Sequence, residues 1–101
     1  MAIILQFDFP YPGPWGAEGV EALRGLAESI TGEPGLIWKA WTENEEEGIA
    51  GGIYYFKDEP SALAYKDMHS ARLASFGIKD IRAKVFDVNE GLSEITRFKN
   101  T

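Results

Sequence analysis

Hydrophobic positions recur along the chain with two different periods, and the two periods alternate. Apolar side chains at every second position, as in residues 3–9, are typical of a β-strand. Apolar side chains three and four positions apart, as in residues 16–30, are typical of an amphipathic helix. These patterns predict a strand at 3–9, a helix at about 16–30, strands at 36–43 and 49–57, a helix from the N-cap Asp58 to about Phe76, a strand at 81–88 and a short helix at 91–99.

The order of the strands and the two long helices predicts the fold class. The order β-α-β-β-α-β is the signature of a ferredoxin-like unit, an α+β fold. In this fold, two helices cover one face of a four-stranded antiparallel sheet. Residues 1–101 are too few for two domains, so we expect a single domain. The pair Gly51-Gly52 inside the third strand predicts either a β-bulge or a close approach of another group.

Large apolar side chains occupy both faces of the predicted strands. In the second strand, simple alternation places Leu36, Trp38 and Ala40 on one face, and Ile37 and Trp41 on the other. Two helices can cover only one face of the sheet, and soluble monomers rarely leave a large apolar patch exposed. We therefore expect a homodimer joined through the sheet faces, with at least one of the two tryptophans deeply buried. A monomer with half-exposed aromatic side chains is the alternative.

The charge balance restricts the classes of partner. The chain carries 16 acidic and 10 basic side chains, a net charge of −6, which argues against binding to nucleic acid or to anionic lipid. The lack of cysteine excludes disulfides and thiolate chemistry, and a single histidine cannot form a histidine-rich metal site. We expect no metal and no cofactor. No segment approaches the roughly 20 apolar residues of a membrane span, and the N-terminus lacks a signal-peptide pattern, so we expect a cytoplasmic protein.

The single histidine, His69, is the first candidate for chemistry. Tyr65 precedes it by four positions and Arg72 follows it by three, so the predicted helix places all three on one face. A neutral imidazole can accept a proton from an acidic phenol or enol, and a guanidinium can hold the resulting oxyanion. We predict His69 and Arg72 as catalytic residues. The alternative is structural: His69 at a polar edge of the helix and Arg72 paired with an acidic neighbour.

Aromatic side chains gather on the two strands that a short hairpin joins. They are suited to line a slot for a flat aromatic ligand, with tyrosine or tryptophan as polar handles. An ordinary sheet core or dimer interface is the alternative. The predicted substrate-binding residues are Trp38, Trp41, Tyr54, Tyr65 and Phe56.

Five stretches of the chain carry a resemblance to a known family: 33–43, 51–56, 61–65, His69 with Arg72-Leu73, and 83–90. Together they closely resemble the bacterial YdhR-like proteins, described as putative monooxygenases, in one register over essentially the whole chain. The resemblance implies the dimeric α+β barrel superfamily, in which two ferredoxin-like subunits pair their sheets. It also implies a cofactor-independent oxygenase acting on small aromatic phenols or enols. Alternatives are a protein of the same fold that binds a small aromatic molecule without chemistry, and a haem protein that uses His69.

Overall fold

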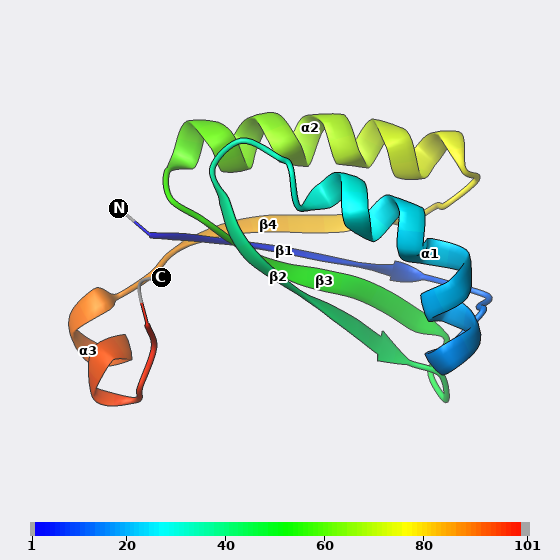
Figure 1. Cartoon of the computed structure of the whole chain (residues 1–101), viewed down its shortest axis with the longest axis horizontal. Helices are drawn as coiled ribbons and strands as arrows, with labels where there is room; N and C mark the ends of the chain where they lie inside the picture. The colour runs from blue at the N-terminus through cyan, green and yellow to red at the C-terminus, as the bar shows by residue number, and fades with distance from the viewer. Residues whose placement is uncertain (1, 100–101) are drawn as a thin grey trace.

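The computed structural model describes residues 2–99, and its elements follow the predicted order (Figure 1). The β-α-β-β-α-β order is confirmed, and most elements begin and end within two residues of the predicted bounds. The last helix is the exception, because it ends at Ile95 rather than at Lys99. The elements are β1 (Ile3–Pro10), α1 (Gly16–Ile30), β2 (Leu36–Asn44), β3 (Ile49–Phe56), α2 (Glu59–Ser75), β4 (Arg82–Asp87) and α3 (Glu90–Ile95).

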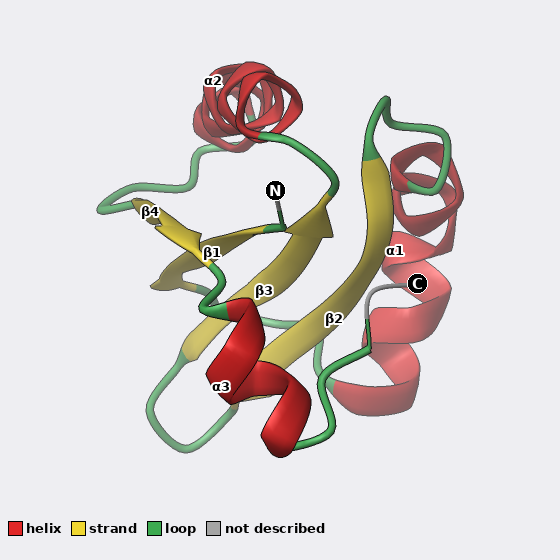
Figure 2. Cartoon of the chain, turned by 90° about the vertical axis from the view of Figure 1, so that its left-hand side faces the viewer, coloured by secondary structure: helices red, strands yellow, loops and turns green. Residues whose placement is uncertain are grey.

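The four strands form one antiparallel sheet in the order β2-β3-β1-β4. Figure 2 shows α2 lying across one face of this sheet, while α1 lies beside β2, which curves along it. Side chains of both helices line one cavity together with the sheet, so the expected arrangement of two helices on one side is confirmed. The short α3 lies on the opposite side of the sheet from α2 (Figures 1 and 2). Within residues 2–99, no helix is long and apolar enough to cross a membrane.

The hydrophobic core lies between α2 and the two central strands. The helix begins at the N-cap Asp58, whose carboxylate accepts a hydrogen bond from the backbone N–H of Ser61 at 2.8 Å, as the sequence predicted. Alternate positions of β1 point toward α2, and the paired positions of β3 do the same. The largest fully buried side chains of the chain belong mostly to this layer: Tyr54, Tyr55, Phe7, Phe56, Ile3, Leu5 and Ile30.

A β-bulge near the start of β2 changes which side chains share a face. Leu36 pairs with Phe56 and Trp38 pairs with Tyr55, so Ile37 is an extra residue without a partner on β3. Leu36 therefore points toward the helices, whereas Trp38 points to the opposite face. The alternation expected from the sequence, which grouped these two side chains, is wrong because simple alternation does not allow for an inserted residue.

The glycines of β3 allow two close approaches rather than a bulge. The pairing of β3 with both neighbours runs without a shift through Gly51 and Gly52. A Cβ atom at Gly51 would overlap the backbone carbonyl oxygen of Phe7 on β1. A Cβ atom at Gly52 would lie 2.6 Å from Cε of Lys39 on β2. Of the two predicted explanations, close approach is the correct one.

The face of the sheet opposite α2 is apolar and partly exposed in the single chain. Tyr55 packs edge-on against Trp38, with ring centroids 5.6 Å apart, and it also contacts the ring of Phe98, at 5.0 Å. Trp38 is 37% exposed and Phe86 on β4 is 46% exposed. Trp41, on the helix side, is 45% exposed. The expectation that Trp38 or Trp41 is deeply buried is therefore wrong for the isolated chain.

Candidate active site

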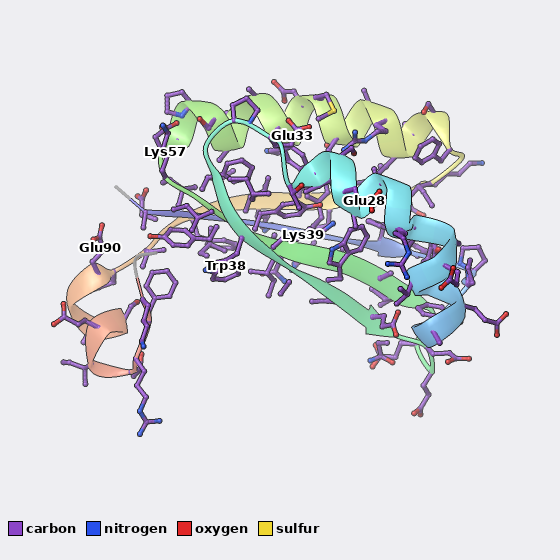
Figure 3. The ribbon with its side chains drawn as sticks, in the orientation of Figure 1. Glu28, Glu33, Trp38, Lys39, Lys57 and Glu90 are labelled. Atoms are coloured by element: carbon purple, nitrogen blue, oxygen red, sulfur yellow. The ribbon has the colours of Figure 1, made fainter. Side chains whose placement is uncertain are left out.

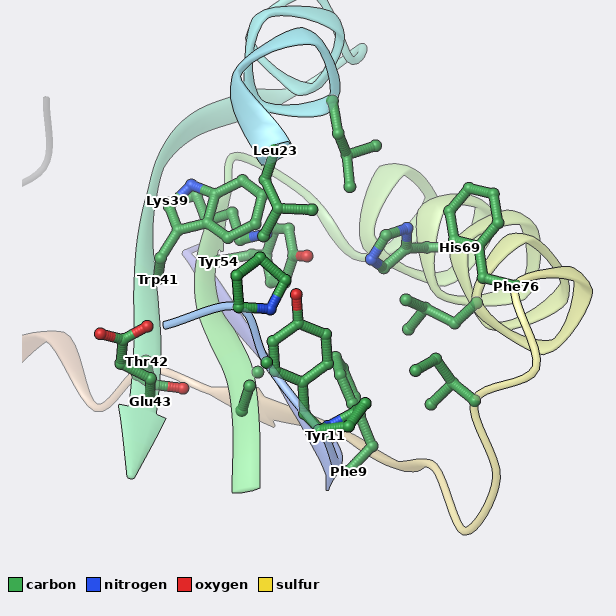
Figure 4. Close-up of a pocket in the computed structure, with 18 residues that line it drawn as sticks. Phe9, Tyr11, Leu23, Lys39, Trp41, Thr42, Glu43, Tyr54, His69 and Phe76 are labelled. Atoms are coloured by element: carbon green, nitrogen blue, oxygen red, sulfur yellow. The ribbon is translucent and has the colours of Figure 1, made fainter. Parts of the chain in front are cut away.

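One cavity of about 290 Å³ lies between α1, α2, the sheet and the loop that follows β1 (Figure 4). Its aliphatic wall comes mainly from the helices, and its aromatic wall comes mainly from the strands and the loop. A cavity of this size is at the lower end of those that enclose small organic ligands, roughly 300–1,000 Å³. The aromatic and polar side chains that line it are Phe9, Tyr11, Lys39, Trp41, Thr42, Glu43, Tyr54, His69 and Phe76.

The orientation of His69 is fixed by its own helix. The side chain of Arg72, one turn further along α2, donates to Nδ1 of the imidazole from Nε at 3.2 Å and from Nη2 at 2.9 Å. Because a guanidinium has only donors, Nδ1 must accept, and the neutral ring must carry its proton on Nε2. The ring of Tyr65 stacks on the imidazole at 5.0 Å, and Phe7 contacts it edge-on at 5.1 Å. The imidazole is therefore held in one place and one tautomer.

The free nitrogen of His69 is available to a ligand. His69 as a residue is only 3% exposed, and its ring extends from α2 into the cavity (Figure 4). In the described part of the chain, every fully enclosed side-chain nitrogen or oxygen has a hydrogen-bond partner. Nε2 of His69 has no such partner there, so this atom is not fully enclosed and opens to the cavity. Burial, together with the charges of Arg72 and Lys39, lowers the pKa of His69 to about 3. At neutral pH, His69 is thus a hydrogen-bond donor to the cavity and a weak base.

Lys39 is a second polar group of the cavity. It lies on the side of β2 that faces the helices, and Figure 3 shows it on the opposite side of the ribbon from Trp38. Its Nζ is 3.3 Å from the centroid of the Trp41 ring and 4.6 Å from that of Tyr54. Burial and the charge of Arg72 lower the pKa of Lys39 to about 7. The amine is therefore divided between its neutral and charged forms near neutral pH.

Two tyrosine hydroxyls connect the cavity to Arg72. The Tyr65 hydroxyl donates to the Tyr54 hydroxyl at 3.3 Å, and Nη2 of Arg72 donates to the Tyr65 hydroxyl at 3.5 Å. Burial raises the pKa of both phenols, so both remain neutral. Arg72 is thus bonded to His69 and Tyr65, and within residues 2–99 it forms no ion pair with a carboxylate. The alternative that it pairs with an acidic neighbour is not what the structure shows.

The residues predicted from the sequence separate into three groups. His69, Trp41 and Tyr54 line the cavity. Tyr65 and Arg72 lie directly behind them and contact them. The other two do not reach the cavity: Trp38 points to the opposite face of the sheet because of the bulge, and Phe56 is fully buried against the rings of Tyr54 and Tyr65.

The sequence interpretation missed Lys39 entirely. A signal was present, because this lysine stands between Trp38 and the pair Ala40-Trp41 inside a strand otherwise rich in apolar residues. The cavity also contains Glu43, whose Oε1 accepts a hydrogen bond from the backbone N–H of Gly16 at 3.1 Å, at the start of α1. Among the described residues, no cluster of three or more histidine, cysteine or acidic side chains is suited to hold a metal ion.

Comparisons with known proteins identify a family and a fold. The family described as "Putative mono-oxygenase ydhR" matches residues 4–99. A solved structure of a putative antibiotic biosynthesis monooxygenase from Deinococcus radiodurans superposes with a TM-score of 0.60 at 12% identity, covering 86% of this chain and 92% of that one. A mutant of SnoaB, a cofactor-independent oxygenase from Streptomyces nogalater, superposes with a TM-score of 0.59 at 15% identity, covering 87% and 93%. At such identities the likeness shows a shared fold. No curated protein matches the chain in sequence.

Proposed function

This chain belongs to the ydhR family, whose members are described as putative mono-oxygenases, and on that premise we propose that it uses O₂ to oxidise a small phenol or enol in the cavity. The substrate binds with its ring against Trp41 and Tyr54 and its hydroxyl toward the cationic side of the cavity. A cavity of about 290 Å³ favours a ligand of one or two rings rather than a macrocycle such as haem.

The observation that carries the proposal is a cavity that is aromatic and also rich in hydrogen-bond donors. Lys39 and the Nε2–H of His69 both face it, and neither has a carboxylate partner among residues 2–99. Such a site favours a ligand that acquires negative charge on oxygen, because buried positive groups stabilise an anion strongly in a low dielectric. The neutral form of a phenol or enol enters an apolar cavity easily, and its anion is the form that reacts with O₂.

An electron-rich substrate needs no other source of electrons. Loss of the hydroxyl proton gives an anion that transfers one electron to O₂, and the substrate radical and superoxide combine to a peroxide at a ring carbon. Loss of water from this peroxide leaves a quinone. One oxygen atom enters the product and the other leaves as water, and the substrate supplies every electron.

His69 and Arg72 have different parts in this scheme. The Nε2–H of His69 donates to the oxygen that becomes negative, either of the substrate or of reduced O₂. Arg72 is a positioning residue, since its contacts are with His69 and Tyr65 and it is not part of the cavity wall. The sequence interpretation assigned the proton acceptor to His69, but an imidazole with a pKa of about 3 is better suited to donate.

Oxygen uptake measured with a panel of phenols and hydroquinones tests the function. We expect uptake that increases with protein concentration and matches the quinone formed. The variant His69→Phe keeps a ring against Tyr65 but removes the donor, and it should lower the rate by about 10²-fold. A protein that only binds such molecules would quench tryptophan fluorescence without consuming O₂, and that result would replace the oxygenase by the non-catalytic alternative.

We also propose that two chains associate through the sheet face opposite α2. Trp38 and Phe86 are partly exposed there, and the face continues through the ring of Tyr55. Since side chains of α1 and α2 line the cavity on the other side of the sheet, this face is the apolar surface that a second copy can cover.

A further inference from the structure

The scheme requires a group that takes the proton of the substrate, and His69 is a poor one. We propose that Lys39 is the proton acceptor of this cavity and that the oxyanion so formed stays beside its ammonium group, which makes weakly acidic phenols and enols the preferred ligands. The inference rests on the proposed function for turnover, but proton transfer on binding can be tested without O₂.

The strand that carries Lys39 gives its side chain a direct path into the cavity. Lys39 pairs with Tyr54 on β3, and Gly52 stands two positions before that tyrosine on the same strand. A Cβ atom at Gly52 would be 2.6 Å from Cε of the lysine, so the missing side chain provides the space for the stem. The amine then lies against Trp41 and Tyr54, at 3.3 and 4.6 Å from the ring centroids. A ligand that stacks on either ring has its substituents within reach of Nζ.

The groups around Lys39 leave it without a counter-ion in the described part of the chain. From α2 it faces the charge of Arg72 and the neutral imidazole of His69. From β3 it faces the neutral phenol of Tyr54, and along β2 the carboxylate of Glu43 lines the same cavity. Glu43 is engaged at the start of α1 through the N–H of Gly16. No ion pair involves Lys39 within residues 2–99, so an incoming oxyanion would be its first close negative partner.

The other titratable groups of the cavity are less suitable as acceptors. Nδ1 of His69 is occupied by Arg72, and Nε2 carries the proton. Tyr54 and Tyr65 keep their protons because burial raises their pKa values. An amine with a pKa near 7 can accept a proton from a weak acid and return it, which is the property of a general base at neutral pH.

The proton transfer is balanced within the cavity. The neutral hydroxyl of the ligand gives its proton to the neutral amine of Lys39, and the products are an oxyanion and an ammonium ion in contact. No proton passes to the solvent. The ion pair is then held between the rings and the Nε2–H of His69.

The probe 4-cyanophenol tests this, because its ultraviolet absorption shifts when it ionises and it is mostly neutral in solution at neutral pH. We expect the parent protein to bind it in the ionised form, with little proton release into a weakly buffered solution just above neutrality. Lys39→Met should bind the probe in its neutral form, at least tenfold more weakly than the parent binds the probe. Lys39→Arg keeps a charge that cannot accept a proton, so it should bind the anion and release about one proton for each probe bound.

A control is Lys79→Met, which removes an exposed lysine of the loop between α2 and β4 that does not line the cavity and should leave spectrum, affinity and proton release unchanged. An ionised probe in Lys39→Met, equal proton release in the parent and Lys39→Arg, or no binding of the probe at millimolar concentration would each overturn the inference. Ionisation that depends on Lys39 without oxygen uptake on any substrate would leave the inference intact and refute the proposed function. Oxygen uptake by Lys39→Met with the same pH profile as the parent would support the proposed function and refute the inference about Lys39.

Discussion

At the scale of single residues, Lys39 has a conflict between stability and chemistry. Its folded-state pKa of about 7 lies below the ordinary value of 10.5, so the unfolded chain binds the proton more tightly. The stability that belongs to this group is complete above about pH 10.5 and is lost as the pH falls toward 7. Near neutral pH the partly buried amine therefore opposes folding, which is common for residues kept for function.

Lys39→Met should therefore raise the free energy of unfolding at neutral pH, by about 1–2 kcal/mol. The reason is that methionine fills a similar volume against Trp41 without a charge to bury. Urea denaturation of the parent and the variant at pH 7 measures the change. Lys79→Met, at an exposed position of the loop between α2 and β4, should shift it by less than about 0.5 kcal/mol. A variant less stable than the parent would mean that the amine supports the fold.

His69 makes a separate prediction about pH. Its pKa falls from 6.5 to about 3 on folding, so the stability it contributes is complete above about pH 6.5 and is lost as the pH falls toward 3. In that interval this group should lower the free energy of unfolding of the parent by up to about 1.4 kcal/mol per pH unit. The variant His69→Phe should lack this contribution to the dependence of stability on pH. Denaturation at a series of pH values tests it. A proton resonance of this single histidine that titrates near pH 6.5 would contradict the predicted shift.

At the scale of elements, the close approaches of β3 are testable by adding one carbon atom. Gly51→Ala would place Cβ against the backbone carbonyl of Phe7, which cannot move aside without disturbing the pairing of β1 with β3. The cost should be about 1–3 kcal/mol, as for other overpacked sites. Gly25→Ala is the matched control, because nothing lies within 4 Å of its Cβ and it is in the middle of α1. It should stabilise the protein by about 0.5–1 kcal/mol. Equal melting temperatures for the two variants would refute this interpretation of Gly51.

The elements also show how far the sequence alone could lead to the site. Helical spacing was sufficient to bring Tyr65, His69 and Arg72 together, because all three belong to one regular helix. The position of Trp38 was not predictable by alternation, since a bulge depends on pairing with β3 and leaves no period in the sequence. Lys39 was missed for a related reason: its surroundings come from β2, β3 and α2, and no local pattern contains them all.

At the scale of the whole molecule, the apolar face opposite α2 leads to a prediction about the proposed dimer. We expect sedimentation equilibrium at micromolar concentration to give twice the 11.2 kDa mass of one chain. Phe86→Glu should shift the equilibrium toward single chains, because it places a carboxylate in a face that the partner would cover. Val20→Glu, at an exposed apolar position of α1, is the control and should leave the mass unchanged. A parent protein that sediments only as single chains would exclude the dimer.

The extra residue at Ile37 has a consequence for how related sequences are to be aligned. Since Ile37 has no partner on β3, a relative that lacks it can keep the facing of every later side chain of β2. A deletion a few positions further on, inside the segment of unbroken pairing, would instead exchange the two faces for the rest of the strand. The side chain of Lys39 or Trp41 would then point away from the cavity, although the same residue type was still present in the sequence. In an alignment, the position of a gap in β2 therefore shows better than percentage identity whether a relative keeps the side chains of this cavity.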